Sequence, residues 1–150
     1  MKMVRRKAGA GLALVLLALA ALCSYAAAQE NTTDYWTERA EELANNSSFE
    51  EAISALDEAL KVDPENETVL IRKASYLCVT GRMNESAETY ERALAILEEE
   101  LKNDPIDAGA WEKKARVLNS LNRKEDSNQA YEKALEVFDQ LQMTQRSESI

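Results

Sequence analysis

The chain has 150 residues, with 18 Lys plus Arg against 27 Asp plus Glu, which gives a formal net charge of −9. This acidic balance argues against binding to nucleic-acid phosphates, and the absence of His removes the commonest general base and metal ligand. Ala, Leu, Glu and Lys are abundant, whereas Gly (4) and Pro (2) are scarce, so the composition favours helices.

The first 28 residues have the pattern of a targeting segment. Four cationic residues lie within residues 2–7, an uncharged apolar run follows from Ala8 to Ala28, and small residues end it at Ala26–Ala28. This order is typical of a secretory signal peptide, so we expect an exported protein, either secreted or on the outer face of the cytoplasmic membrane. An apolar run of this length also spans a bilayer, so an uncleaved membrane anchor helix is the alternative.

Three stretches after the targeting segment align with one another. Each opens with a large residue, followed four residues later by Ala and three residues further on by Leu. The positions are Trp36, Ala40 and Leu43, then Leu70, Ala74 and Leu77, then Trp111, Ala115 and Leu118. Apolar residues at this four-then-three spacing line one face of a helix, so each stretch begins with an amphipathic helix.

A second helix is expected after a turn in each stretch. Its inward positions recur as Leu56, Ala59 and Leu60, then Tyr90, Ala93 and Leu94, then Tyr131, Ala134 and Leu135. The turns are predicted at residues 45–48, at Gly81 and at residues 121–123, with Gly81 in the left-handed conformation that ends a helix. Ser48 and Glu51 predict a capping box that opens the second helix of the first stretch.

The second and third stretches are separated by seven more residues than the first and second. Pro64 and Pro105 close the first two helix pairs, since proline cannot continue a helix. Seven residues are almost two helical turns, so they lengthen a helix while nearly preserving its facing. Because Leu97 and Leu101 continue the apolar stripe, we predict that the second helix of the second pair runs to about Lys102.

These residues resemble the tetratricopeptide repeat family over most of the chain after residue 34. The resemblance implies an all-α fold, a right-handed α-solenoid of three helix–turn–helix repeats with about six helices. The expected segments are a disordered leader at 29–34, a domain at 35–143 with repeats at 33–66, 67–107 and 108–141, and a disordered tail at 144–150. Departures from the family pattern are Ser86 and Ser127 in place of Ala and Asn122 in place of the turn glycine.

The resemblance also implies a scaffold that binds a protein or a peptide, with no cofactor, rather than an enzyme. Stacked repeats form a concave groove lined by the first helix of each pair. Candidate groove residues lie between the core positions of these helices and are Thr37, Glu41, Ile71, Ser75, Cys78, Glu112, Arg116 and Asn119. Only Arg116 fits the Lys/Asn/Arg clamp with which some family members hold a C-terminal carboxylate, so we do not expect that kind of ligand.

An alternative function is that of a structural subunit or spacer in a cell-envelope complex. The third repeat is followed by no recognisable capping helix, so Phe138, Leu141 and Met143 are expected to be exposed, and weak self-association through this end is a second hypothesis. Contact with a membrane is expected only through residues 8–28, if the leader stays uncleaved. The carboxylates lie on expected exposed helix faces and no phosphate-binding or nucleophile motif is present, so catalysis is not expected.

The motif for N-glycosylation occurs five times, at Asn31, Asn45, Asn46, Asn66 and Asn84. All five sites fall in the leader or in expected turns, where a transferase reaches them if the host has one. Asn, Ser and Thr are also the residues that turns and helix caps use, so the sequence leaves both interpretations open. After the leader, Cys78 is the only cysteine, and no internal disulfide is expected.

Overall fold

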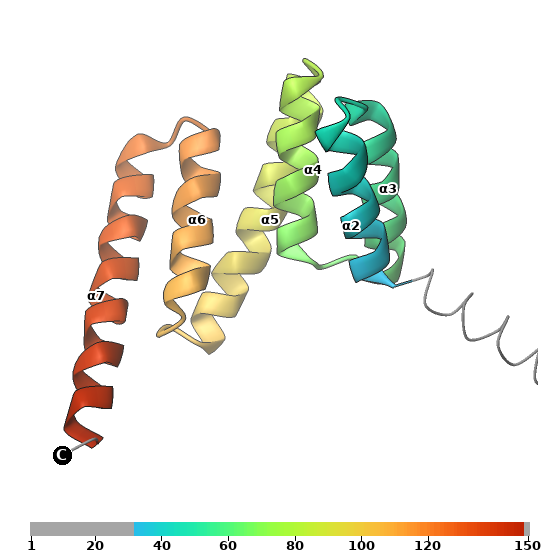
Figure 1. Cartoon of the computed structure of the whole chain (residues 1–150). Helices are drawn as coiled ribbons and strands as arrows, with labels where there is room; N and C mark the ends of the chain where they lie inside the picture. The colour runs from blue at the N-terminus through green and yellow to red at the C-terminus, as the bar shows by residue number, and fades with distance from the viewer. Residues whose placement is uncertain (1–31, 149–150) are drawn as a thin grey trace, which may run out of the picture.

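The computed structural model describes residues 32–148, which form six helices. They are α2 (Thr33–Asn45), α3 (Phe49–Val62), α4 (Glu67–Val79), α5 (Met83–Asn103), α6 (Ala108–Ser120) and α7 (Lys124–Glu148). Consecutive helices pair as the hairpins α2/α3, α4/α5 and α6/α7, and these stack through α3 on α4 and α5 on α6 (Figure 1). The predicted α-solenoid of three helix pairs is confirmed for this part of the chain.

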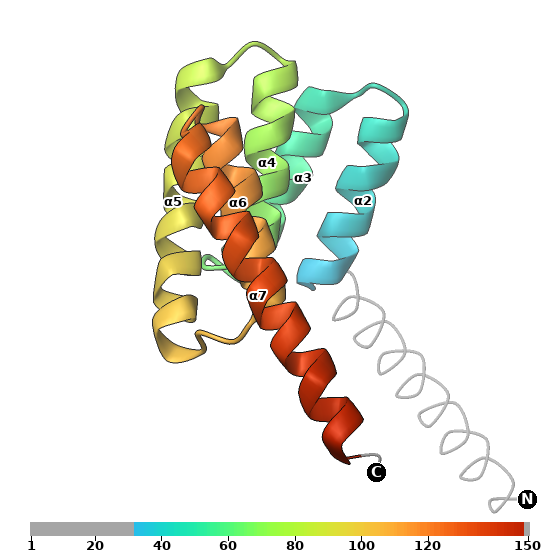
Figure 2. The same cartoon turned by 90° about the vertical axis from the view of Figure 1, so that its left-hand side faces the viewer.

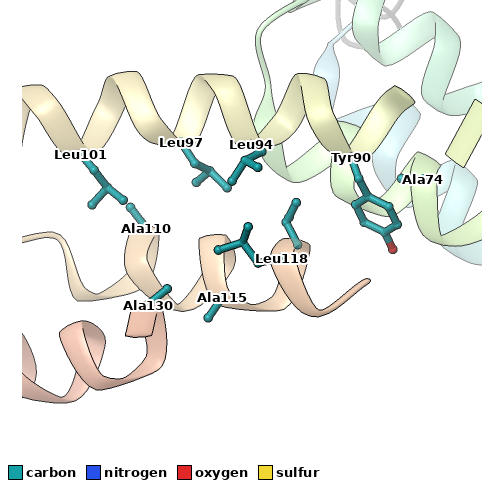
Figure 3. Close-up of a cluster of buried hydrophobic side chains, with 10 residues drawn as sticks. Ala74, Tyr90, Leu94, Leu97, Leu101, Ala110, Ala115, Leu118 and Ala130 are labelled. Atoms are coloured by element: carbon teal, nitrogen blue, oxygen red, sulfur yellow. The ribbon is translucent and has the colours of Figure 1, made fainter. Parts of the chain in front are cut away.

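Two clusters of buried side chains hold the stack together. The first joins α2, α3 and the start of α4 and contains Ala40, Ala52, Ala55, Leu56, Ala59 and Val69. The second joins α4 to α7 and includes Ala74, Tyr90, Leu94, Leu97, Leu101, Ala110, Ala115, Val117, Leu118 and Ala130 (Figure 3). The repeated Ala and Leu positions of the sequence are therefore core positions in the first two helix pairs and in α6, where alanine lets the helix backbones approach closely, whereas Leu135 of α7 is exposed.

The predicted long second helix is confirmed, because α5 runs to Asn103. Leu97 is fully buried and Leu101 is 7% exposed, and both belong to the cluster that α6 covers (Figure 3). At 1.5 Å per residue, the seven added residues lengthen α5 by about 10 Å. The chain therefore turns back into α6 further along the α5 axis than a repeat of ordinary length would allow.

All three turns inside the hairpins have the same backbone geometry. One residue in each turn has a positive φ: Ser47 (63°), Gly81 (80°) and Asn122 (60°). The next backbone N–H donates 2.9 Å to a carbonyl in the last turn of the preceding helix, in the pairs Ser48 to Leu43, Arg82 to Leu77 and Arg123 to Leu118. This is the Schellman arrangement, and the sequence identified it only at glycine.

The predicted capping box at Ser48 is wrong. The Ser48 side chain makes no capping hydrogen bond, and its ψ of 62° departs from the extended backbone of a side-chain cap. The Schellman turn imposes this conformation because the Ser48 N–H is already bonded to Leu43. Side-chain caps stand instead before the first helices, where Asn66 accepts from the Val69 N–H at 3.0 Å and Asp107 from the Ala110 N–H at 2.9 Å.

Both predicted disordered flanks are too long. α7 continues through Glu148, so residues 144–148 of the expected tail are helical. This stretch contains no Gly or Pro, and Gln, Arg and Glu are good helix formers. At the other end α2 begins at Thr33, inside the expected leader, because the Thr32 hydroxyl accepts a hydrogen bond from the Tyr35 N–H at 3.2 Å.

The expected signal or anchor helix at residues 1–28 lies outside the described residues. Among residues 32–148, no helix is long and apolar enough to cross a bilayer.

The serines that depart from the family pattern have a structural role. Ser86 and Ser127 are 4% and 3% exposed. Each donates a 2.8 Å hydrogen bond to a backbone carbonyl of the first helix of its own repeat, Ser86 to Ala74 and Ser127 to Ala115. The serine hydroxyl is buried here but hydrogen-bonded, so the core accepts it in place of the alanine of the family pattern.

Candidate functional site

A cleft of about 210 Å³ lies between α4 and α6. It is lined from α4 by Thr68, Ile71, Arg72 and Ser75 and from α6 by Lys113 and Arg116. On each helix every lining residue has another one three or four positions away, so the set shares one face. Three of the eight predicted groove residues, Ile71, Ser75 and Arg116, thus meet at one place.

The cleft is positively charged although the chain is acidic. Arg72 forms an ion pair with Glu41 of α2, and the Lys113 Nζ lies 2.5 Å from Glu67 Oε1 of α4. Arg116 is exposed and has no ion-pair partner among the described residues. Two of the three cations therefore cross-link neighbouring first helices, while the third is free to attract an anion.

The ion pair between Lys113 and Glu67 is the better shielded of the two cross-links. The Glu67 side chain is only 14% exposed. Burial acts to raise the pKa of Glu67, but the hydrogen bonds from Lys113 and Thr68 and the charge of Lys113 outweigh it, so the pKa is lowered. The carboxylate therefore stays charged at neutral pH and fixes one wall of the cleft.

Ser75, which lines the cleft from α4, is held in place by two hydrogen bonds of its hydroxyl. Ser75 Oγ donates to the Ile71 carbonyl at 3.0 Å and lies 2.8 Å from the Tyr90 hydroxyl. Because the single Ser75 proton is used by the carbonyl, Tyr90 is the donor of the second bond. Tyr90 of α5 thereby anchors the α4 side of the cleft to the core.

The remaining predicted groove residues lie outside the cleft. Glu41 contacts its edge through Arg72, and the Thr37 hydroxyl donates to the Thr33 carbonyl at 2.7 Å. Cys78 is exposed, with its Sγ 3.8 Å from the Met83 sulfur.

Glu112 and Asn119 also lie outside the cleft, and Glu112 borders a hollow at the end of the array instead. Sequence reasoning missed Thr68, Arg72 and Lys113. The three-residue spacing of Lys113 and Arg116 was the available signal, since it places both cations on one helix face.

A larger hollow of about 630 Å³ lies on another face of α6, between α5 and α7. The Lys114 Nζ lies there, 3.1 Å from Glu98 Oε1 and 5.4 Å from the centre of the Trp111 ring. Two further ion pairs line it, Arg123 with Asp126 and Lys133 with Glu136. Its cations are already neutralised, so it offers a charged ligand less than the cleft at Arg116 does.

The end of the array formed by α6 and α7 has an apolar hollow of about 410 Å³. Its lining includes Tyr131 and Leu135, which are 40% and 66% exposed, and Phe138, which is 52% exposed. Glu112 and Gly109 border it from α6. Further along α7, Leu141 (40%) and Met143 (70%) are also exposed, so the expected exposure of this end is confirmed.

The four glycosylation motifs within the described residues differ in their surroundings. Asn45, Asn46 and Asn84 are exposed. Asn66 is half-buried, and its amide nitrogen donates to Asp63 Oδ2 at 3.0 Å while its oxygen caps α4. Asn66 thus has the helix-capping role that the sequence left open, whereas Asn31 lies outside the described residues.

Among residues 32–148, no group of His, Cys, Asp and Glu could hold a metal ion. The pKa of Glu100 is raised by partial loss of solvent around its carboxylate and by the nearby Glu67 carboxylate. Glu100 is nevertheless largely exposed on α5 and borders none of the hollows described above.

The sequence and the helix pairs define a repeat protein. Profiles of the tetratricopeptide repeat match residues 33–66 and residues 65–140. The chain belongs to the tetratricopeptide repeat family, whose members are generally interaction scaffolds rather than enzymes. No curated protein matches the sequence.

Solved structures share the fold at low sequence identity. A crystal structure of MamA superposes with a TM-score of 0.51 at 14% identity, covering 75% of this chain and 62% of MamA. The Sgt2 TPR domain from Aspergillus fumigatus gives 0.50 at 21% identity, covering 71% and 66%. The second TPR of Spaghetti (RPAP3), bound to the HSP90 peptide SRMEEVD, gives 0.50 at 14% identity, covering 75% and 98%. The chain thus spans about three fifths of MamA and about two thirds of the Sgt2 domain.

Proposed function

We propose that this protein is an interaction scaffold that binds a short acidic segment of a partner protein in the cleft between α4 and α6. The observation that carries the proposal is Arg116, an exposed cation without an ion-pair partner among the described residues, beside the apolar Ile71. An acidic segment with one apolar side chain complements this pair.

Different residues of the cleft would make different contacts with the peptide. Arg116 donates charge-assisted hydrogen bonds to a carboxylate, which are stronger than neutral ones. Ile71 provides apolar surface for one neighbouring side chain, and the paired Arg72 and Lys113 keep the walls in place. Because about 210 Å³ is less than most small-molecule sites occupy, the cleft accommodates one or two side chains while the peptide backbone runs along the surface.

The fold supports a peptide ligand. Stacked helix pairs offer extended surfaces on which a peptide makes contacts with several repeats. The RPAP3 domain is bound to a peptide, SRMEEVD, that contains three acidic residues. At 14% identity this precedent supports the class of ligand, and the contacts must come from the residues of this chain.

Selection from a displayed library of random heptapeptides, followed by fluorescence anisotropy with the enriched peptides, tests the proposal. We expect acidic peptides, and we expect Arg116→Glu to weaken their binding by roughly tenfold or more, since a charge-assisted bond is replaced by repulsion. Arg92→Glu is the matched control, because it makes the same charge change at an exposed position of α5. Enrichment of neutral peptides, or equal losses in both variants, contradicts the proposal.

We also propose that the scaffold acts outside the cytoplasm. The support is the order of charged, apolar and small residues in residues 1–28. N-terminal sequencing of protein from its own host tests this: a new terminus near Gln29 indicates cleavage, and an intact terminus with protease access to residues 32–148 indicates an anchored, exported protein. A chain that stays intact and protected inside the cell contradicts the proposal.

The alternative function, a structural subunit that assembles through its C-terminal end, is supported by the exposed Tyr131, Leu135 and Phe138. It differs in where the partner sits. Truncation after Leu135 removes assembly through this end, whereas Arg116→Glu affects a ligand of the cleft.

A further inference from the structure

The end formed by α6 and α7 leaves uncovered the surface that an additional repeat would cover. At the first internal junction, α4 packs over the α2/α3 hairpin, where Leu56 is fully buried. The equivalent residue of the third hairpin, Tyr131, is 40% exposed. Figure 2 shows α7 lying across the front of the array with no described helix over it.

The first junction shows which contacts a docked helix pair makes. Its ring contact joins Phe49 to Tyr76, with centroids 5.7 Å apart. Its ion pairs join Asp57 to Lys73 at 2.5 Å, Glu50 to Arg82 at 3.1 Å, and Glu41 to Arg72. In each of these ion pairs the acid lies on the first repeat and the base on the second.

The two ends of the array carry matching residues at these same positions. In a contact between two copies, the third repeat of one copy takes the place of the first repeat, and the first repeat of the next copy takes the place of the second. Lys124 then stands at the position of Phe49 and Glu42 at the position of Tyr76, so Lys124 faces Glu42. The same equivalences give Glu132 facing Arg39, Arg116 facing Glu38, and Glu125 facing Ser48. Three of the four pairs join opposite charges, and in the fourth a serine hydroxyl replaces the base that Glu125 would need. In the pairs Lys124–Glu42 and Arg116–Glu38 both residues differ in charge or chemistry from those of the first junction.

Apolar contacts complete the match. Val69 of α4 is 2% exposed because it packs in the core cluster of the first repeat. Its equivalent in α2 is Tyr35, which is 38% exposed. An aromatic side chain is therefore available to cover the exposed Tyr131 and Leu135.

We propose that copies of this chain associate head to tail, with α2 of one copy docked on α6 and α7 of the next in the register of the first internal junction. The charge pattern selects a second copy of the chain as the occupant. Lys124 and Glu132 have no ion-pair partner among the described residues, and Glu42 stands where Tyr76 and Val117 are packed in the other repeats.

The contact uses two different surfaces, so it does not close on itself and copies add in an open series. Glu112, which borders the apolar hollow, has no basic counterpart among the four matched pairs, and Arg39 must leave its 3.0 Å pairing with Glu42 in the same helix. Both costs make the association weak and dependent on concentration.

Charge-exchange variants of the full chain in a mild detergent, studied by sedimentation velocity over a range of protein concentrations, test the proposal. The wild type is expected to grow beyond a dimer as concentration rises, and less so at high salt. Glu42→Lys and Lys124→Glu are each expected to weaken association by roughly tenfold, since an attraction becomes a repulsion. An equimolar mixture of the two variants restores association, because each meets its complement in the other.

Each other outcome overturns the proposal. A wild type that stays monomeric shows that the charged ends are caps, and growth that stops at a dimer indicates a closed, symmetric contact. Association of each variant alone, or no recovery on mixing, removes the Lys124–Glu42 contact. Glu88→Lys, on the exposed face of α5, controls for a general charge effect, and unchanged thermal unfolding by circular dichroism shows that the variants fold.

The proposal shares one residue with the peptide-binding function, because Arg116 lines the cleft and also faces Glu38 in the head-to-tail contact. Lys124→Glu and Glu42→Lys lie outside the cleft lining, so loss of association in these two variants with peptide binding retained separates the two proposals.

Discussion

Removing a glycine from one turn and adding a glycine to the equivalent turn are expected to change the free energy of unfolding in opposite directions. Gly81 and Ser47 both hold a positive φ, of 80° and 63°, at the same position of the Schellman turn. A Cβ added at Gly81 meets nothing within 4 Å, so the effect of Gly81→Ala is confined to the backbone. Ser47→Gly is the reverse change, at a site where a residue with a side chain holds the left-handed conformation.

The expected magnitude follows from two opposing terms. The left-handed conformation costs an L-residue about 1–2 kcal/mol relative to glycine. Against this, glycine stabilises the unfolded chain by about 0.5–1 kcal/mol through its greater conformational freedom, which lowers the free energy of unfolding. Gly81→Ala is therefore expected to lower the free energy of unfolding by about 1 kcal/mol, and Ser47→Gly to raise it by about 0.5–1 kcal/mol.

Urea unfolding of the full chain, followed by far-ultraviolet circular dichroism, measures both changes. Ser48→Gly is the matched control, because this neighbouring residue has a negative φ of −85° and no capping bond, so the substitution is expected to destabilise by a few tenths of a kcal/mol. If Ser47→Gly destabilises as much as Ser48→Gly does, the left-handed turn does not determine the stability of this hairpin.

Three further predictions concern the packing between and within repeats. Glu67→Gln breaks the ion pair with Lys113 and is expected to lower the free energy of unfolding by about 1 kcal/mol at pH 7. Because the folded pKa of Glu67 is lowered, this stabilisation is present above the unfolded pKa of about 4.3 and is lost as pH falls through the folded pKa. The free energies of unfolding of the two proteins, measured with urea, should therefore converge in acid. Leu101→Ala removes a core side chain that is 7% exposed and should cost about 2–4 kcal/mol in urea unfolding. Ser86→Val places a β-branched side chain against the Ala74 carbonyl in place of a hydrogen bond and should cost about 1–3 kcal/mol, whereas Ser86→Ala should cost less, as thermal unfolding of the three proteins will show.

The helix pairs followed from the sequence because their signal is repeated. Leu56, Tyr90 and Tyr131 recur with the same neighbours, and such periodicity reports which face of a helix is buried. The length of α5 was also predictable, since seven residues without Gly or Pro continue one apolar stripe.

The cleft was only partly predictable because it depends on which residues of neighbouring first helices face each other. Ile71, Ser75 and Arg116 were identified from their positions within the repeat, but Lys113 was not, although its equivalent Arg72 likewise pairs with the preceding repeat. Glu112 occupies a groove position in the sequence and borders the end of the array instead. Local spacing places a residue on a helix face, and it does not say which neighbouring helix that face meets.

The turn at residues 45–48 was predicted, but the positive φ of Ser47 was not, for a different reason. Glycine at position 81 indicates a positive φ directly, and asparagine at position 122 indicates it more weakly, because both residue types tolerate the left-handed conformation. Serine does not favour this conformation, so Ser47 gives no such sign and adopts it because the packed hairpin requires it.

One helix, α4, links the two parts of the core. Its Val69 packs in the cluster of the first repeat, while its Ala74 packs in the cluster that extends to α7. Loss of α2 and α3 would remove one of these clusters and leave the other nearly complete, so hydrogen exchange should detect two blocks that open separately. Because α4 belongs to both blocks, we expect a partner that holds one block to slow exchange in the other only through this helix.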